Sequence, residues 1–322
     1  MNNLQIYKKT LGFSLRRVFW DLIGIILLLA LGTLGFFVGD QAAGEGPIGL
    51  VLGLLIGLIA LIIITRFVSY GLKAGQIAMM TRGITEGELP DDVIAEGKKV
   101  VKERFLTVAA FFAITRAIKG IFGQLGKAIT NVTQNVGGDT GKSIGSVISS
   151  IMQTIINYLC DCCLGWVFYR QGVSSAKAAC EGAAIFFKHG KTFFKNMGRI
   201  FGIGFLSFIV IGGAFTGIFY PIITAHPEIY LTIGEALQEA LAEETSAFAE
   251  LLKNPGTLPI VLAAIGGIII WAMLHSVFIK PFVLTGVLRN FMESGMNDVP
   301  SEASMSFIDT KSDRFRKLHQ QA

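Results

Sequence analysis

The sequence predicts an all-α integral membrane protein with about six transmembrane helices in three hairpins, each preceded by a basic amphipathic interfacial helix. Two observations lead to this fold class. First, 52% of the 322 residues are hydrophobic and only 16% are charged, a composition typical of chains that fold in lipid. Second, the apolar runs have spanning length and the basic residues gather on one side of them. We therefore expect one polytopic membrane domain over residues 1–322.

The apolar runs pair into hairpins. The first run, Val18–Val38, has no small-residue cleavage site, so we interpret it as a transmembrane helix rather than a signal peptide. Phe105–Gly123 is just long enough to cross a bilayer at about 1.5 Å per residue, although it contains Arg116 and Lys119. The three expected hairpins cover residues 18–65, 105–169 and 200–279.

The distribution of lysine and arginine predicts the topology, because these residues are retained in short cytoplasmic loops. With both termini inside, the inner segments hold 23 basic residues and the outer segments hold three. If residues 105–123 did not cross the membrane, the bias of basic residues toward the inner side would reverse over the second half of the chain. An acidic outer helix over 231–252 and a cytoplasmic tail over 289–322 complete the arrangement. We expect a multi-pass protein of the bacterial cytoplasmic membrane.

The most basic stretch lies between the second and third hairpins. Its basic residues recur at spacings of three and four, opposite several phenylalanines, as Lys188, Lys191, Lys195 and Arg199. Such a helix lies on a membrane surface and binds anionic lipids of the inner leaflet. The alternative is that this face binds an acidic partner protein. The net charge of +5 is too modest to indicate nucleic-acid binding.

Similar phrases close the returning helix of each hairpin and predict an internal repeat. They read Phe67-Val-Ser-Tyr-Gly71, Phe168-Tyr-Arg-Gln-Gly172 and Phe282-Val-Leu-Thr-Gly286. Together with the acidic Glu-Leu-Pro-Asp stretch over 88–91, a basic helix and a new hairpin, this order resembles uncharacterised bacterial and archaeal six-helix membrane families. It also resembles the membrane domain of some glycerophosphodiester phosphodiesterases. The run Gly172–Phe187 is similar to part of choline-transporter-like proteins. These resemblances imply a membrane fold and no catalytic residues.

Polar residues inside the predicted spans are the first candidates for function, because they are costly in lipid. They are Arg116, Lys119, Asn157, Asp161 and His275. Asp161 needs a partner, and Arg116 lies at a similar depth in the same hairpin, so we expect these two side chains to pair. The pair is either a structural ion pair or part of an ion pathway or proton relay. A third possibility is that Asp161 is exposed near the interface.

Two further patterns concern packing. Gly49, Gly53 and Gly57 lie four residues apart and leave bare backbone along one helix face. This face packs against a helix of the same subunit, or it contacts another copy of the chain or lines a pore. Three cysteines, at positions 160, 162 and 163, cannot converge on one ion from consecutive helical positions. We therefore predict small buried packing residues there, with no metal and no cofactor.

Two classes of function remain. No paired carboxylates, Ser-His-Asp set or zinc-ligand spacing occurs in the sequence, so we do not expect an enzyme. The repeats, the glycine-spaced helix and the intramembrane charges favour a permeation component, either a channel or a transporter. The alternative is a non-catalytic scaffold or accessory subunit that assembles with itself or with another membrane protein.

Overall fold

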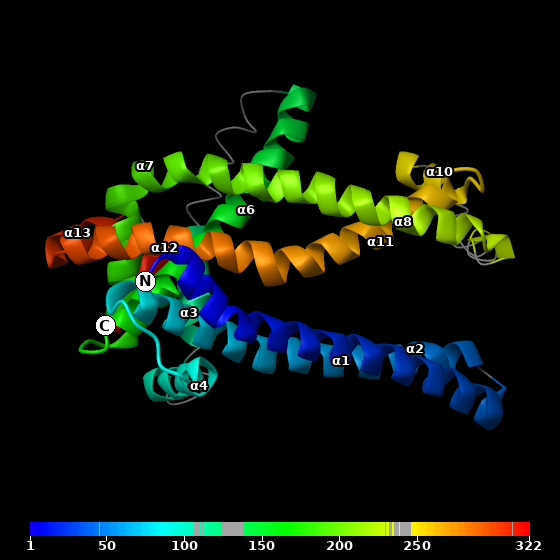
Figure 1. Cartoon of the computed structure of the whole chain (residues 1–322), viewed down its shortest axis with the longest axis horizontal. Helices are drawn as coiled ribbons and strands as arrows, with labels where there is room; N and C mark the ends of the chain where they lie inside the picture. Colours follow the sequence, from blue (N-terminus) through cyan, green and yellow to red (C-terminus); the bar gives the residue numbers. More distant parts are fainter. Residues whose placement is uncertain are drawn as a thin grey trace. The chain divides into compact units, whose positions relative to one another are not determined.

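The computed structural model describes most of the chain. The backbone is described except at residues 45, 106–109, 111, 124–137, 229, 232–233, 235–237, 239–245 and 311. The description also excludes the side chains at residues 43, 47, 65–67, 138–152, 190–201 and 247–248. The described part is helical and has no strand, which confirms the predicted all-α class. It forms two compact units, a larger one (Met1–Met197 and Pro281–Ala322) and a smaller one (Gly198–Lys280). Figure 1 labels the helices.

Within the described residues, three helices are long and apolar enough to cross a membrane. They are Asn3–Ala42, Gly202–Thr224 and Leu258–Asn297, and the apolar helix Ile48–Ile63 is shorter. The structure therefore supports the membrane class that the composition predicts.

The larger unit begins with two long antiparallel helices, α1 (Asn3–Ala43) and α2 (Gly46–Ile63). A capping box formed by Asn2 and Gln5 starts α1, and Gly44 ends it with a left-handed φ of 69°, which only glycine adopts without strain. The basic segment expected to form an interfacial helix before the first hairpin belongs to the same continuous helix as the apolar segment that follows it.

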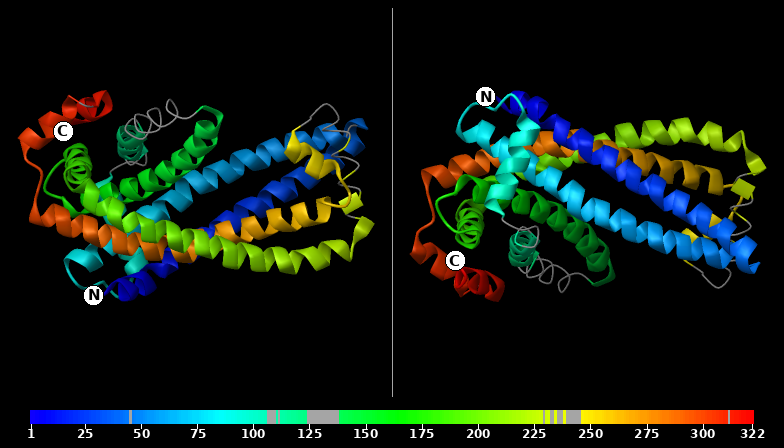
Figure 2. Two further views of the ribbon diagram at one scale, coloured as in Figure 1. Left: turned by 90° about the horizontal axis from the view of Figure 1, so that it is seen from above. Right: turned by 90° about the horizontal axis from the view of Figure 1, so that it is seen from below.

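The glycines of α2 lie where this helix meets α1. A Cβ added to Gly49 or Gly53 would collide with a backbone carbonyl oxygen of α1, that of Gly35 or Leu31 respectively. A Cβ on Gly57 would lie 2.8 Å from the Leu28 Cα. The two helices therefore pack backbone against backbone, and they run side by side in every view (Figures 1 and 2).

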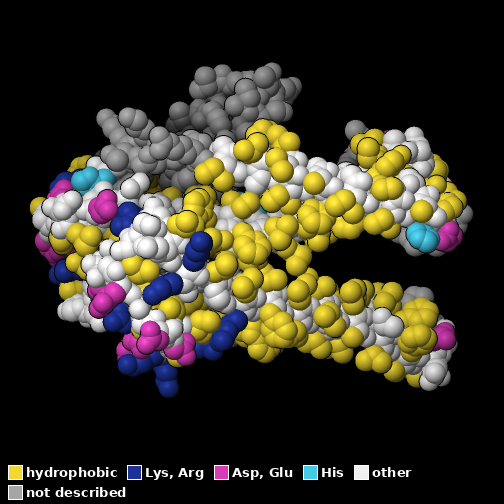
Figure 3. Space-filling view, viewed as in Figure 1, with side chains coloured by type: hydrophobic (Ala, Val, Ile, Leu, Met, Phe, Trp, Pro, Cys, Tyr) yellow, Lys and Arg dark blue, Asp and Glu magenta, His cyan; other side chains and the backbone are white. Residues whose placement is uncertain are grey.

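A second part of the larger unit, which we call the head, surrounds a well-packed core. It consists of the start of α1, the C-terminal part of α6 (Gly138–Tyr169), the N-terminal part of α7 (Ser175–Ser207), α3 (Tyr70–Thr85), α4 (Val93–Arg104) and α12 (Lys280–Asn297) with the helices that follow it. Phe13, Trp166, Phe291 and Phe315 are fully buried in it. Figure 3 shows charged side chains gathered over the head, whereas the α1–α2 surface is hydrophobic.

The predicted cytoplasmic tail is a folded part of the head. After α12 the chain forms α13 (Glu302–Asp309) and α14 (Asp313–His319), and the hydroxyls of Ser301 and Ser312 cap them. The apolar side chains at a spacing of three residues are buried, namely Met305, Ile308, Phe315 and Leu318. The low hydropathy of this segment predicts a polar tail, but the structure has two short amphipathic helices there.

The smaller unit contains a second antiparallel pair, α8 (Gly213–Thr224) and α11 (Leu258–Leu274). A Cβ added to Gly266 would lie 2.8 Å from the Phe219 ring, so this pair also packs closely. The helix α10 (Ala247–Lys253) precedes α11. Most of the predicted acidic helix over 231–252 lies outside the described residues.

In the described part of the chain, three segments have π-helical geometry, in which each turn contains about one residue more than an α-helical turn. They are η1 (Ile64–Ser69), η2 (Phe208–Gly212) and η3 (His275–Ile279). Through η1 the helix α2 continues directly into α3, so the apolar hairpin and the head share one helical rod from Gly46 to Thr85.

Candidate functional site

Asp161 lies in a buried part of α6 and pairs with a lysine. Its residue is only 4% exposed, and Lys73 Nζ on α3 lies 2.5 Å from its Oδ1. The other oxygen, Oδ2, is buried and has no hydrogen-bond partner among the described residues. Burying a carboxylate is costly unless a cation balances it, so Lys73 accounts for the charge and leaves one oxygen unused.

This ion pair corrects the prediction that Arg116 is the partner of Asp161. Arg116 is exposed on the helical segment 112–123. Its neighbours Thr115 and Lys119 line a small cavity beside Asp161, and consecutive helical residues point about 100° apart. Our prediction compared depths within one hairpin only. The true partner comes from the continuation of the first hairpin into α3, a long-range contact that depth along the chain does not reveal.

Two further cations and one further carboxylate belong to this cluster. Arg17 and Lys119 both interact electrostatically with Asp161, and Arg17 also interacts with Asp21. Lys119 Nζ donates a hydrogen bond to the Tyr70 hydroxyl at 3.1 Å, and Asp21 Oδ1 accepts one from Ser69 at 2.7 Å. We call the charged residues Arg17, Asp21, Lys73, Lys119 and Asp161 the Asp161 cluster. It combines three cations with two anions.

The cavity beside Asp161 has a volume of about 10 Å³, roughly the space for one water molecule. Its lining includes Tyr70, Lys73, Thr115, Lys119, Cys160 and Asp161. These polar groups come from three helical segments that are far apart in the sequence. The arrangement can hold a water or pass a proton between groups, but it has no room for a larger solute as it stands.

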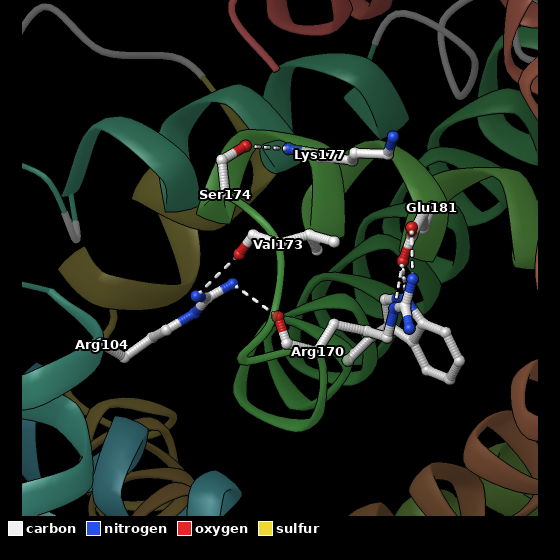
Figure 4. Close-up of polar contacts among 7 residues, drawn as sticks. Arg104, Arg170, Val173, Ser174, Lys177 and Glu181 are labelled. Carbon is white, nitrogen blue, oxygen red and sulfur yellow. Dashed lines mark hydrogen bonds and ion pairs between the residues drawn. The ribbon is translucent and has the colours of Figure 1, made fainter.

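A second polar network fixes the turn between α6 and α7 (Figure 4). Glu181 is 2% exposed, and both of its oxygens accept hydrogen bonds from the Arg170 guanidinium, at 2.8 and 3.0 Å. Trp166 Nε1 donates to the same carboxylate at 2.9 Å. The hydrogen bond to Glu181 raises the pKa of Arg170 above its ordinary value. We call these three residues the Glu181 clamp.

Arg104 completes the support of this turn. Its guanidinium donates to the backbone carbonyl oxygens of Val173, at 3.0 Å, and Arg170, at 3.1 Å (Figure 4). Burial lowers the pKa of Arg104. Sequence reasoning missed both networks. The only signal for them is the set of charged residues on either side of the Gly172 turn.

The remaining predicted polar residues lie elsewhere. Asn157 is half-buried in α6. His275 lies in the smaller unit, where its ring centre is 5.2 Å from that of Trp271, and Trp271 Nε1 donates to the Ser207 hydroxyl at 3.1 Å. The four cysteines are buried free thiols, and the described residues contain no group of His, Cys, Asp and Glu that could hold a metal ion.

Of the four basic residues predicted to meet lipid, only the Lys188 side chain lies within the described part. Lys191, Lys195 and Arg199 lie outside it. Lys188 Nζ lies 2.6 Å from an oxygen of Asp298, and His189 Nε2 lies 3.3 Å from the same oxygen. The hydrogen bond from Lys188 lowers the pKa of Asp298. Lys188 therefore ties α7 to the end of α12.

Comparison with known proteins adds no assignment to this geometry. The resemblances noted above rest on the quoted segments alone, since no family model, no curated protein and no solved structure matches the chain.

Proposed function

We propose that this protein is a permeation component, channel-like or transporter-like, of the bacterial cytoplasmic membrane. In this proposal the chain crosses the membrane six times, has both termini inside, contacts anionic lipids of the inner leaflet and catalyses no reaction. The observation that carries it is the Asp161 carboxylate, which is buried, paired on one oxygen and unpaired on the other beside a water-sized cavity. Ionisable groups buried in membrane proteins are candidates for ion pathways and proton relays.

The position of the Asp161 cluster suggests how it acts. Arg17 directly precedes the apolar part of α1, and Lys73 lies about three helical turns beyond Ile63, the last residue of α2. The cluster therefore lies at the cytoplasmic end of the first hairpin. There the Asp161 carboxylate can switch its ion pair between Lys73 and Lys119. Each switch leaves one ammonium group without its counter-charge, so that this group can interact with a permeating ion. We infer an entrance controlled by charge rather than a binding site at the membrane centre.

Substitution of Asp161 by asparagine tests this role. In proteoliposomes we expect Asp161→Asn to lower the flux of protons or small ions at least tenfold, because the neutral amide cannot exchange between the two lysines. Asp91→Asn, an exposed residue in the loop before α4, is the matched control and should keep the wild-type flux. The permeation proposal would be overturned if the wild-type protein transported no protons, no chloride and no potassium. Equal flux in all three proteins would remove Asp161 from it.

A second candidate function is a scaffold or accessory subunit. The folded head favours it, because α12, α13 and α14 follow the last expected span and build a structured body that is not needed to connect spans. Partners in this case are further copies of the chain or another membrane protein. The mass of the particle extracted in mild detergent distinguishes this function from a permeation component that works as a monomer.

Labelling of single cysteines tests the six-span topology. We expect His226→Cys, which is exposed, to react with an impermeant thiol reagent in intact cells, and the exposed Asp91→Cys to react only after permeabilisation. The native cysteines give little background, because all four are buried and burial raises the pKa of the Cys180 thiol to about 12. The reverse labelling pattern would exclude this topology.

A further inference from the structure

The head contains a cleft of about 530 Å³ between α3, α4 and the turn that follows α6. This volume lies within the range of small-molecule binding sites in proteins, about 300–1,000 Å³. Met79, Val100 and Phe168 give the cleft an apolar side. The cleft is separate from the Asp161 cluster, because none of the charged residues of that cluster lines it.

Charged residues in the lining leave the cleft with an excess of negative charge. Arg82 lies 2.7 Å from a Glu86 oxygen and 3.5 Å from a Glu96 oxygen, and the exposed Lys99, which does not line the cleft, lies 3.9 Å from the other Glu96 oxygen. The hydrogen bond to Glu86 raises the pKa of Arg82, which therefore stays charged. Glu103 also lines the cleft, is exposed and forms no ion pair with any described residue. Three carboxylates and one guanidinium give the lining a net charge of two negative units.

Two further groups in the lining can meet a bound cation. Thr81 is 3% exposed, and its buried hydroxyl oxygen has no hydrogen-bond partner within the described part of the chain. Tyr169 is 40% exposed, and an aromatic ring at the edge of a cleft attracts cations through its π face. Glu103 is exposed and has no ion pair with a described residue, so a ligand with N–H donors can reach it directly.

We propose that this cleft binds a linear aliphatic diamine. Two ammonium groups match the net charge of the lining, and a short methylene chain matches the apolar side formed by Met79, Val100 and Phe168. Glu103 pairs with one ammonium group, and the carboxylate of Glu86 shares the other with Arg82. The proposal does not depend on permeation, since it uses none of the residues of the Asp161 cluster.

Isothermal titration of the full-length protein with 1,6-diaminohexane tests the proposal, and 1,6-hexanediol is the uncharged ligand of the same length. We expect the diamine to bind and the diol to show no binding. Glu103→Gln should weaken diamine binding at least tenfold, whereas Asp91→Asn, a nearby exposed carboxylate outside the cleft, should leave it unchanged. Val100→Phe, which fills the cleft without changing its charge, should also weaken binding.

Three results would overturn the proposal. The first is the absence of diamine binding to the wild-type protein. The second is an equal loss of affinity in Glu103→Gln and Asp91→Asn, which would indicate attraction to surface charge only. The third is undiminished affinity in Val100→Phe, which would place the diamine outside the cleft. The melting temperature of each variant without ligand checks that the head is folded.

Discussion

Replacement of Glu181 by alanine is expected to lower the free energy of unfolding by about 3 kcal/mol. Removing one partner of a buried ion pair costs about 3–5 kcal/mol, because the other partner is left without its counter-charge. The lower figure applies here, since the Arg170 side chain is 32% exposed and can still reach water. Trp166 Nε1 also loses its acceptor. Unfolding in mixed micelles, followed by tryptophan fluorescence, measures the change.

The control for this experiment is a carboxylate in an exposed ion pair. Glu293 lies 4.0 Å from Arg289 and its side chain is 54% exposed, so Glu293→Ala should cost no more than about 1 kcal/mol. Glu181→Gln should fall between the two, because an amide oxygen can still accept the hydrogen bond from Trp166. Equal losses in the alanine variants would show that the Glu181 clamp does not hold the α6–α7 turn.

Substitution of Gly53 by valine is expected to separate α1 from α2 and to destabilise the hairpin by about 3 kcal/mol or more. The added Cβ would collide with the carbonyl oxygen of Leu31, and a backbone cannot yield as a flexible side chain can. Overpacking of a well-filled contact costs about 1–3 kcal/mol in proteins, and here the contact is lost along several turns. The same unfolding measurement in mixed micelles reports the loss.

Gly217→Val provides the matched control. Gly217 also lies in an apolar helix, but a Cβ at this position meets no atom within 4 Å. The substitution should therefore change the stability by less than about 1 kcal/mol, because the added side chain meets no neighbour and valine has a helix propensity no lower than that of glycine. A comparable loss in both variants would show that the effect does not come from the packing of α1 on α2.

Local patterns predicted the parts of this fold that depend on one helix at a time. Composition and the length of the apolar runs indicated an all-helical membrane protein. The spacing of Gly49, Gly53 and Gly57 indicated a helix face for close packing, and in the structure α1 covers this face. The need of Asp161 for a cation also followed from the sequence alone. In each case the physical cause, burial or helical periodicity, acts within a few turns of the chain.

The identity of that cation could not be predicted in the same way. The ammonium group paired with Asp161 belongs to Lys73 on α3, and the rotation of the segment 112–123 places Lys119 rather than Arg116 at the cavity beside Asp161. That rotation depends on packing between helices that are distant in the sequence. The folded helices α13 and α14 were missed for a related reason, since their few apolar residues form a core only together with the other helices of the head.

The π-helical segment η1 has a consequence for the spacing between the hairpin and the head. A π turn holds about one residue more than an α turn, so loss of a single residue from Ile64–Ser69 would let the rod become a regular α-helix. A π turn absorbs its extra residue with almost the same total rotation, so the head would keep its angular position relative to α2 after this loss. The same loss from the regular helix between Gly57 and Ile63 would instead rotate everything beyond it by about 100°, and Lys73 would turn away from Asp161. The segment η1 is thus the part of the rod that can lose one residue while the glycines of α2 still face α1 and Lys73 still faces Asp161.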